Sequence, residues 1–228
     1  MAVTISIALQ KGGTGKSTTA QALASTLGFK QKKILLIDMD AQGNVTYSSN
    51  INKPDKTVTD VLGEECRADE AIIHCKYYDL LAADSYLTNV EMTENVEPAL
   101  GKLSFNSLIA SNYVVIPIEP RPFALQGLGA LHNTIKSIRN RLNPSLKVLG
   151  ILLIKYNNRM VLNRDLKAMI DDYAKQMDTT VFHTSIREGI AVSEAQTVRE
   201  PLIDYAKNSK PNIDYKAFTT ELLQMIGV

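Results

Sequence analysis

Short apolar runs alternate along this chain with segments in which apolar residues recur every three or four positions. Residues 3–9 and 33–38 are apolar runs rich in strand-forming residues, so each predicts a buried strand. Between them, apolar residues recur at the spacing of one helix face, at Ala20, Leu23, Ala24 and Leu27. We expect Gly28 to end that helix. Strand, helix and strand in this order predict a βαβ unit with parallel strands.

The same alternation continues to the end of the chain. Further strands are predicted over residues 78–81, 113–118 and 148–154, and helices over residues 125–142, 162–173 and 211–226. This order is typical of an α/β fold, a doubly wound and mostly parallel twisted sheet flanked by helices. A chain of 228 residues fits one such domain, so we expect residues 1–228 to form a single domain.

Composition and charge exclude several classes of protein. The 25 Lys and Arg residues nearly balance the 24 Asp and Glu residues, so the chain lacks the overall basic field of a dedicated nucleic-acid binder. Cys66 and Cys75 are too few for a disulfide framework. No run reaches the roughly 18 apolar residues needed to cross a bilayer. We therefore expect a cytoplasmic protein without a membrane segment.

A glycine-rich loop follows the first predicted strand. Residues 10–18 read Gln-Lys-Gly-Gly-Thr-Gly-Lys-Ser-Thr, which ends as a phosphate loop does, although Gln10 replaces the usual first glycine. Backbone N–H groups of such a loop cradle phosphates at the start of a helix. Lys16 can then reach the β- and γ-phosphates, and Ser17 can bind Mg²⁺. The predicted nucleotide-binding residues here are Lys11, Gly12, Gly13, Thr14, Gly15, Lys16, Ser17 and Thr18.

Lys11 is an additional lysine at the mouth of this loop. The segment Lys11-Gly-Gly-Thr-Gly-Lys16-Ser17 resembles the deviant phosphate loop of the ParA/MinD family of ATPases, which are P-loop NTPases of the SIMIBI-like class. The resemblance implies ATP/ADP and Mg²⁺ as cofactors and a homodimer that forms on ATP binding. It also implies that Lys11 reaches the partner's phosphates and so links hydrolysis to dimerisation.

A second segment resembles the first switch of this family. Residues 36–44 read Leu-Ile-Asp-Met-Asp-Ala-Gln-Gly-Asn, with Ala41 where proline is common. The resemblance implies that Asp40 positions the attacking water and that Asp38, with Ser17, supports Mg²⁺. Orientation of water contributes much of the catalysis in phosphoryl transfer. The predicted catalytic residues are therefore Lys11, Lys16 and Asp40.

Resemblance continues in the second half of the chain. Residues 114–128 resemble the family's strand, proline-rich turn and helix at the dimer face. Residues 155–159 resemble its strand end near the adenine, which adds Asn157 and Arg159 as nucleotide-binding candidates. Residues 193–195 and 201–205 also match the ParA pattern, so the resemblance covers nearly the whole chain.

One family feature is missing. The central strand that ends in a second switch, with an Asp-Thr-Pro-Pro-like sequence, does not occur, and residues 89–97 run directly into a segment that resembles the part after that switch. Either a helix and strand are absent near residues 97–101, or the sheet closes in another way. We favour the first reading because the flanking sequences resume in register. Such a loss would expose the edges of both neighbouring strands.

The DNA contacts usual in ParA proteins do not transfer. Glu188 and Ala191 stand where that family commonly has arginines. Candidate replacements are Arg187, Arg199, Lys207 and Lys210, for which solvated surface charge is the alternative. Contacts through such residues would be to phosphates, independent of sequence and weakened by salt.

The leading hypothesis is an Mg²⁺-dependent ATPase that partitions a plasmid or chromosome region. It implies non-specific DNA and a centromere-binding partner protein as partners, with nucleoid association in the cell. A non-hydrolysing ATP-sensing regulator is the alternative that the missing second switch favours. A membrane-positioning ATPase of the MinD kind would need a basic amphipathic tail, and residues 213–228 hold a single cation, Lys216.

Overall fold

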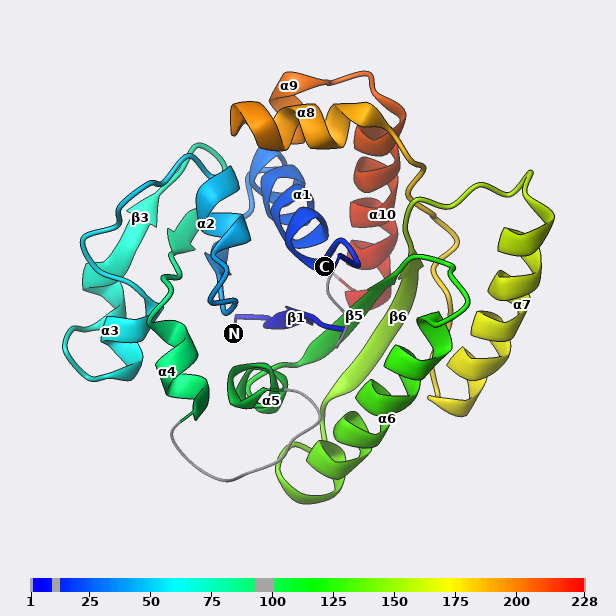
Figure 1. The fold of residues 1–228 in the computed structure, drawn as a ribbon, viewed down its shortest axis with the longest axis horizontal. Coiled ribbons are helices and arrows are strands. Elements are labelled where there is room, and N and C mark those ends of the chain that lie inside the picture. The colour runs from blue at the N-terminus through cyan, green and yellow to red at the C-terminus, as the bar shows by residue number, and fades with distance from the viewer. Residues whose placement is uncertain (1, 10–12, 93–100, 228) are drawn as a thin grey trace. The chain divides into compact units, whose positions relative to one another are not determined.

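The computed structural model describes residues 2–9, 13–92 and 101–227 (Figure 1). These residues divide into two compact units. Unit 1 comprises Met1–Lys16, Glu97–Gly189 and Ala217–Val228. Unit 2 comprises Ser17–Val96 and Ile190–Lys216. A single domain of 228 residues stays a prediction, and we describe each unit by itself.

Unit 1 contains a parallel sheet of three strands. Its order is β1 (Ile5–Ile7), β5 (Tyr113–Ile118) and β6 (Lys147–Leu153), with β5 in the middle. Isolated parallel bridges from Ile151 to Val181 and from Ile154 to Ile186 extend the pairing beyond β6. All three strands run the same way, so their carboxyl ends lie at one edge of the sheet.

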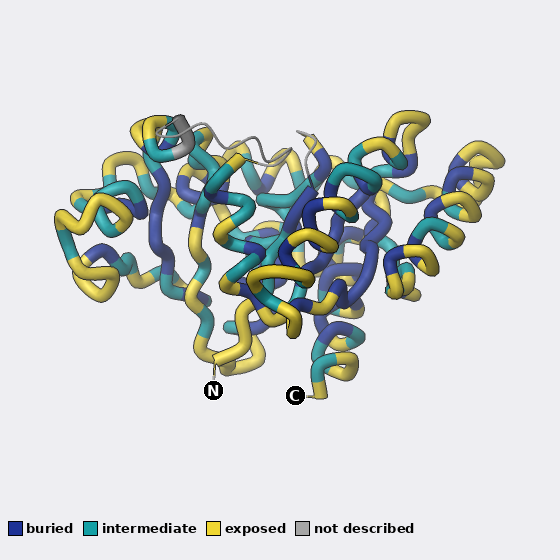
Figure 2. Tube along the Cα trace, turned by 90° about the horizontal axis from the view of Figure 1, so that it is seen from below, coloured by how far each residue is buried: buried dark blue, intermediate teal, exposed yellow. Residues whose placement is uncertain are grey.

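Three helices cover one face of this sheet, namely α5 (Lys102–Ile109), α6 (Ala124–Arg141) and α7 (Val161–Gln176). Their apolar faces share one core with β5 and β6, which are buried along most of their length, whereas β1 is only partly buried. Figure 2 colours the chain by burial. Helix α6 contributes a repeat of buried side chains at helical spacing: Leu128, Leu131, Ile135 and Ile138. The helix predicted over residues 125–142 is therefore confirmed, within one residue at each end.

Unit 2 contains a second sheet of three strands. Its order is β2 (Leu35–Ile37), β4 (Asp79–Leu81) and β3 (Ile72–His74), with β3 antiparallel to β4. Helix α1 (Lys16–Phe29) covers one face of this sheet, and Ala24 of α1 shares a core with Leu80 of β4. The sequence predicted β2 and β4 but not β3.

Gly28 has a different role from the predicted helix stop. Helix α1 continues to Phe29, and the left-handed residue beyond its end is Gln31, with φ 62°. A Cβ atom at Gly28 would lie 1.7 Å from the backbone oxygen of Tyr77. Glycine is therefore required because α1 and the chain before β4 approach closely, and the expected C-terminal stop was wrong.

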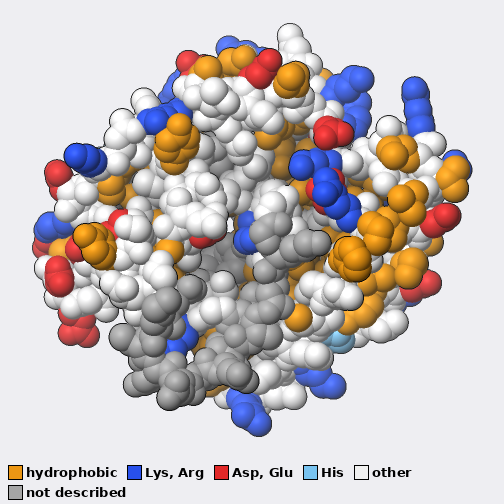
Figure 3. Space-filling view, in the orientation of Figure 1, with side chains coloured by type: hydrophobic (Ala, Val, Ile, Leu, Met, Phe, Trp, Pro, Cys, Tyr) orange, Lys and Arg blue, Asp and Glu red, His pale blue; other side chains and the backbone are white. Residues whose placement is uncertain are grey.

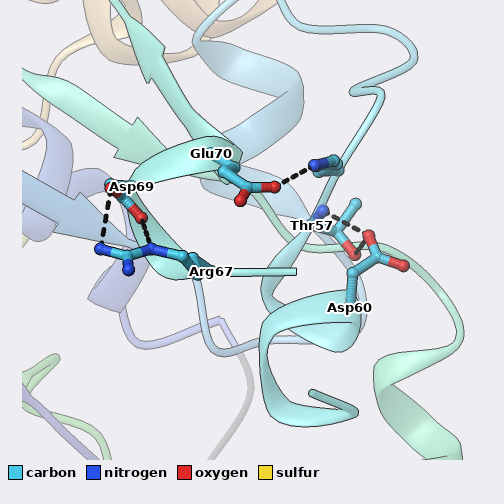
Figure 4. Close-up of polar contacts among 6 residues, drawn as sticks. Thr57, Asp60, Arg67, Asp69 and Glu70 are labelled. Carbon is cyan, nitrogen blue, oxygen red and sulfur yellow. Dashed lines mark hydrogen bonds and ion pairs between the residues drawn. The ribbon is translucent and has the colours of Figure 1, made fainter. Parts of the chain in front are cut away.

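The remaining helices of unit 2 are short, apart from the C-terminal one. They are α2 (Asn44–Ser48), α3 (Val58–Leu62), the 3-10 helix η1 (Ala68–Ala71), α4 (Leu87–Met92), α8 (Ile190–Val198), α9 (Leu202–Tyr205) and the first part of α10 (Lys210–Ile226). Asp60 holds the start of α3, because its carboxylate accepts hydrogen bonds from the N–H and hydroxyl of Thr57 (Figure 4). Ion pairs join Lys56 to Glu70 and Arg67 to Asp69 beside it.

The mostly parallel α/β architecture agrees with the prediction. Helices flank both sheets, but the described strands form two sheets of three rather than one continuous sheet. Consequently β1 and β2 each have a single pairing partner among the described strands. Within the described ranges, no helix combines the length and apolar character needed to cross a bilayer.

Candidate functional site

The described part of the predicted phosphate loop in unit 1, residues 13–16, follows β1 along the chain, at the carboxyl end of that strand. Gly13 and Gly15 have φ values of 73° and 69°, a left-handed conformation that side chains rarely adopt. A Cβ atom at Gly15 would also lie 2.5 Å from Cδ1 of Ile154. Helix α1 begins at Lys16. A left-handed glycine loop that opens a helix is the arrangement that turns backbone N–H groups toward an anion.

Residues 10–12 lie outside the described residues, so the predictions for Lys11 and Gly12 stay predictions. Of the others, Thr14 is buried, and Ser17 lies in the first turn of α1. The Thr18 hydroxyl accepts a hydrogen bond of 2.9 Å from Nε2 of Gln196, within unit 2. This bond gives Thr18 a role in holding α8 against α1, which the loop motif did not reveal.

A hollow of about 230 Å³ lies beside the phosphate loop within unit 1. Gly13 and Thr14 contribute to its lining, and so do three charged residues that follow β5 and β6, namely Glu119, Arg121 and Lys155. The Glu119 carboxylate lies 2.7 Å from an Arg121 nitrogen and 3.6 Å from Nζ of Lys155. The hollow therefore carries two cations and one anion and presents net positive charge to a ligand.

The sequence analysis missed these three charged residues. Glu119 and Arg121 fall in the segment assigned to the dimer face, and Lys155 begins the segment assigned to the adenine region. Lys155 has φ 49°, an uncommon conformation for a residue with a side chain. Their place directly after β5 and β6, where ligands bind in α/β sheets, was the signal that could have identified them.

Asp38 follows β2 in unit 2 and is 3% exposed. Its Oδ2 accepts hydrogen bonds of 2.9 Å from both the N–H and the hydroxyl of Thr46. Burial raises the pKa of the Asp38 carboxyl, and the two bonds from Thr46 oppose that rise. Thr46 thus holds the Asp38 side chain in one orientation, and its two hydrogen bonds favour the charged form of that carboxylate.

Asp40 lies two residues further on and is only partly buried. Its Oδ1 accepts a hydrogen bond of 3.0 Å from the N–H of Gln42, and its carbonyl accepts one of 2.8 Å from the N–H of Gly43. Gly43 has φ 59° and immediately precedes α2. These contacts fix the turn, and the second carboxylate oxygen remains able to orient a water, as the predicted role requires.

The donor set in unit 2 fits Mg²⁺ in part. Mg²⁺ usually keeps several waters and takes one or two protein oxygens together with phosphates. Ser17 offers a hydroxyl at the start of α1, and Asp38 offers a carboxylate that already accepts bonds from Thr46. Asp38 is therefore better suited to hold water bound to the ion than to bind it directly. Groups of three or more metal-binding side chains are absent from the described part of the chain.

Asn157 and Arg159, the adenine candidates, lie in the exposed turn between β6 and α7. Oδ1 of Asn157 accepts a hydrogen bond of 3.0 Å from the N–H of Arg159. The carbonyl of Asn157 accepts a 3.3 Å bond from Nδ2 of Asn163 in α7. Asn157 therefore shapes the start of α7, and a nucleotide contact by either candidate stays a prediction.

The four DNA candidates differ in their surroundings. Arg187 is exposed and belongs to unit 1, whereas Arg199, Lys207 and Lys210 belong to unit 2. The Arg199 guanidinium lies 3.9 Å from the ring centre of Tyr47 and donates a hydrogen bond to Asn52. Arg199 therefore packs α8 against the α2 region, while Lys207 and Lys210 are exposed.

Exposed apolar side chains gather over α7 (Figure 3). Met160, Val161 and Leu162, at the start of α7, are 52%, 61% and 55% exposed. Phe123, at the start of α6, is also exposed. Both helix starts follow strands whose carboxyl ends lie at the same edge of the unit 1 sheet as the phosphate loop, so apolar surface and phosphate loop share that edge.

Comparison with known proteins identifies the family. The model of the AAA domain family matches residues 2–97 and 95–148, which together exceed half of the chain. An uncharacterized protein of Pseudomonas putida is 33% identical over 254 aligned positions, with 98% of this chain and 95% of that protein covered. The chromosome partitioning protein ParA of Myxococcus xanthus is 31% identical, with 96% and 87% covered.

Solved structures agree on the fold. A structure of cobyrinic acid a,c-diamide synthase from Mycobacterium smegmatis with bound ADP and magnesium has a TM-score of 0.82 and 26% identity, with 100% of this chain and 96% of that chain covered. The motifs, the fold and the relatives lead to one conclusion. The chain belongs to the AAA-domain family of P-loop ATPases that includes the ParA chromosome partitioning proteins.

Proposed function

We propose that this chain binds ATP with Mg²⁺ and hydrolyses it as a dimerisation switch in DNA partition. The observation that carries the proposal is the left-handed pair Gly13 and Gly15 directly before the helix that opens with Lys16. Only a loop of this kind needs glycine at both positions, a following lysine and a helix start together. ADP and magnesium in the Mycobacterium smegmatis structure support the same ligands here.

Each residue has a defined role in the proposed reaction. Lys16 would neutralise the β- and γ-phosphates, and Ser17 and Asp38 would hold Mg²⁺. The ion would supply positive charge to the phosphates when bound. Asp40, which is fixed in its turn by Gln42, orients the attacking water. Charge placed in advance in this way lowers the barrier without reorganisation during the reaction.

Dimerisation would complete the site. Lys11 from a second copy would reach the phosphates, as the resemblance to deviant phosphate loops implies. The exposed apolar residues Phe123, Val161 and Leu162 support an interface at the edge that carries the loop, because apolar surface at the start of both helices gains by being covered. The homodimer would thus bring apolar contact and phosphate binding to one face.

The proposal also includes two partners of this chain, which are non-specific DNA and a centromere-binding partner protein. Lys207 and Lys210 are exposed cations of unit 2, and Arg187 is an exposed cation of unit 1. Contacts of such residues with DNA would be made to phosphates and would weaken as salt rises. The Myxococcus xanthus relative is a chromosome partitioning protein, which supports this assignment.

A specific observation favours a second candidate, a regulator that binds ATP without hydrolysing it. The two described sheets end at β1 and β2, and the family match is divided at residues 95–97. A protein without the second switch would keep the phosphate loop but lose part of the hydrolytic machinery.

Phosphate release from ATP, measured with and without non-specific DNA, distinguishes the two candidates. The proposed ATPase predicts turnover that increases with DNA and is lost in Lys16→Ala. In Lys11→Ala we expect nucleotide binding to persist while turnover linked to dimerisation disappears, and in Asp40→Ala we expect dimers without turnover. Asn106→Ala, a change at an exposed position of α5, is the matched control.

Two results would count against the proposal. ATP binding with no phosphate release under any condition would favour the sensing regulator. Turnover that is unchanged in Lys11→Ala, in a protein that stays monomeric with ATP by light scattering, would exclude the dimerisation switch.

A further inference from the structure

Three charged residues follow the strands of the unit 1 sheet and have no role in the proposed reaction. Glu119 and Arg121 follow β5, and Lys155 follows β6. They line the hollow of about 230 Å³ together with Gly13 and Thr14. The residues that line this hollow all belong to unit 1, so its geometry is set within one compact unit. Ligands of α/β sheets bind where such strands end.

The cations of this group are more accessible than the anion. The Glu119 side chain is 18% exposed, against 45% for Lys155 and 63% for Arg121. Oε1 of Glu119 pairs with Arg121, and Oε2 pairs with Lys155. A mostly buried carboxylate requires a positive partner, and this one has two. The group therefore carries one surplus positive charge, on side chains that a ligand can reach.

The backbone at Lys155 is held in a strained conformation. Its φ of 49° is left-handed, which costs free energy in a residue with a side chain. On one side, the N–H of Ile154 donates a hydrogen bond of 2.9 Å to the carbonyl of Ile118. On the other, the N–H of Tyr156 donates one of 3.0 Å to the carbonyl of Ile186. Strain that is held in this way by its surroundings is concentrated at ligand-binding sites.

The predicted phosphate loop lies against the residue that precedes Lys155. A Cβ atom at Gly15 would lie 2.5 Å from Cδ1 of Ile154, so the loop backbone rests directly on that side chain. Gly13 and Thr14 of the loop share the hollow with Lys155. A water molecule occupies about 30 Å³ in the liquid, so a hollow of about 230 Å³ has room for a phosphate group. The loop and the two cations thus border one space.

We propose that the hollow is a second anion subsite, in which Lys155 and Arg121 contact phosphate oxygens of the nucleotide held by the loop of the same chain. This inference rests on the proposed nucleotide binding. The Glu119 carboxylate pairs with both cations in the structure. Phosphate oxygens compete with it, because arginine and lysine bind carboxylates and phosphates with the same donors. Glu119 therefore weakens ligand binding, and the two cations strengthen it.

A purely structural role for the three residues leads to a different expectation. If the ion pairs served only to hold the ends of β5 and β6, the loss of any member would leave ligand affinity unchanged or lower it. The anion subsite instead requires opposite signs, because Glu119 competes with the ligand while Lys155 and Arg121 bind it. The direction of the change in Glu119→Gln therefore separates the two roles.

Calorimetric titration of the full chain with a non-hydrolysable ATP analogue and Mg²⁺ tests the subsite. We expect affinity about fivefold lower in Lys155→Asn and in Arg121→Gln, and about fivefold higher in Glu119→Gln, the effect of one unit charge at about 4 Å in a water-like medium. Asparagine suits position 155 because it tolerates the left-handed conformation. Inorganic tripolyphosphate, which lacks the nucleoside, should rank the variants in the same order, because the subsite binds phosphate.

Lys147→Asn is the matched control, since Lys147 is exposed at the amino end of β6, the opposite end of that strand from Lys155. Its affinity should equal that of wild type. Two cation variants are used so that one misfolded protein, recognised by circular dichroism, leaves the other informative. Wild-type affinity in both Lys155→Asn and Arg121→Gln would overturn the subsite and leave the proposed nucleotide site intact, and so would weaker binding by Glu119→Gln. No binding by wild type would overturn both.

Discussion

Strands β5 and β2 are both apolar in sequence, but β5 is buried and β2 is partly exposed. β5 has a partner on each side, and Val114, Val115 and Ile116 are all 0% exposed. β2 has one described partner, and Leu35 and Ile37 are 48% and 46% exposed. An apolar run therefore predicts a strand that is suited to burial, and whether it is buried depends on its neighbours.

The difference also separates the functions of the two sheets. The phosphate loop follows β1 and lies beside β5 and β6, in a sheet whose core is closed by three helices. Asp38 and Asp40 follow β2, whose sheet is open on one side. The residues proposed to bind phosphate thus follow a strand of the closed sheet, and the residue proposed to position water follows a strand of the open one.

The largest expected difference in stability is between the same truncation, isoleucine to alanine, in β5 and in β2. Ile116→Ala in β5 should lower the free energy of unfolding by about 3–5 kcal/mol, since it leaves a cavity in a closed core. Ile37→Ala in β2 should cost less than about 1 kcal/mol, because that side chain is half exposed. Urea denaturation measures both. Equal losses would contradict the open face of β2.

The next effect concerns the covered face of the β2 sheet. Gly28→Ala should destabilise the protein by about 3 kcal/mol, the upper end for overpacking, because its Cβ would meet the Tyr77 backbone oxygen. Gly127→Ala in α6 makes only an ordinary contact, 3.6 Å from Leu9. It should be neutral or stabilise by about 0.5–1 kcal/mol through helix propensity. Melting temperatures of the two variants provide the test.

A third prediction concerns pH. The pKa of Asp38 is raised by burial, so the folded state holds this proton more tightly than the unfolded state. Its contribution to stability therefore declines as pH rises from the ordinary carboxyl range through the raised pKa. Asp38→Asn should remove that decline, so the variant gains stability relative to wild type toward neutral pH. If the difference in unfolding free energy between Asp38→Asn and wild type did not change with pH, burial would not be what sets the pKa of the Asp38 carboxyl.

The smallest expected effect is at Arg199. Arg199→Ala removes the stacking on Tyr47 and should cost about 0.5–1 kcal/mol. Because the Arg199 side chain contacts Tyr47 and Asn52 within unit 2, we expect Arg199→Ala to lower DNA affinity less than Lys207→Ala does. Gel shifts at two salt concentrations compare the variants. A larger loss of DNA binding in Arg199→Ala would restore it as a DNA contact.

Sequence periodicity predicted most elements, and local chemistry predicted the loop. β1, α1, β2, β5 and β6 were recognisable because long apolar patterns and a glycine motif each have one structural explanation. β3 was missed because its apolar run covers only Ala71 to Ile73, between Glu70 and His74. The true reason for Gly28 is a contact with Tyr77, distant in sequence, and the hollow at Glu119 and Lys155 joins two strand ends. Such features depend on tertiary contacts that periodicity does not contain.

The central claim is that the closed sheet of unit 1 keeps a working phosphate site although the β2 sheet is open. Calorimetric titration of the wild-type chain with a non-hydrolysable ATP analogue and Mg²⁺ tests it most directly. We predict one saturable site, with affinity about 10- to 100-fold lower in Lys16→Ala, because a hydrogen bond to a charged group contributes about 1.5–3 kcal/mol. No binding by wild type, or equal binding by Lys16→Ala, would contradict the account.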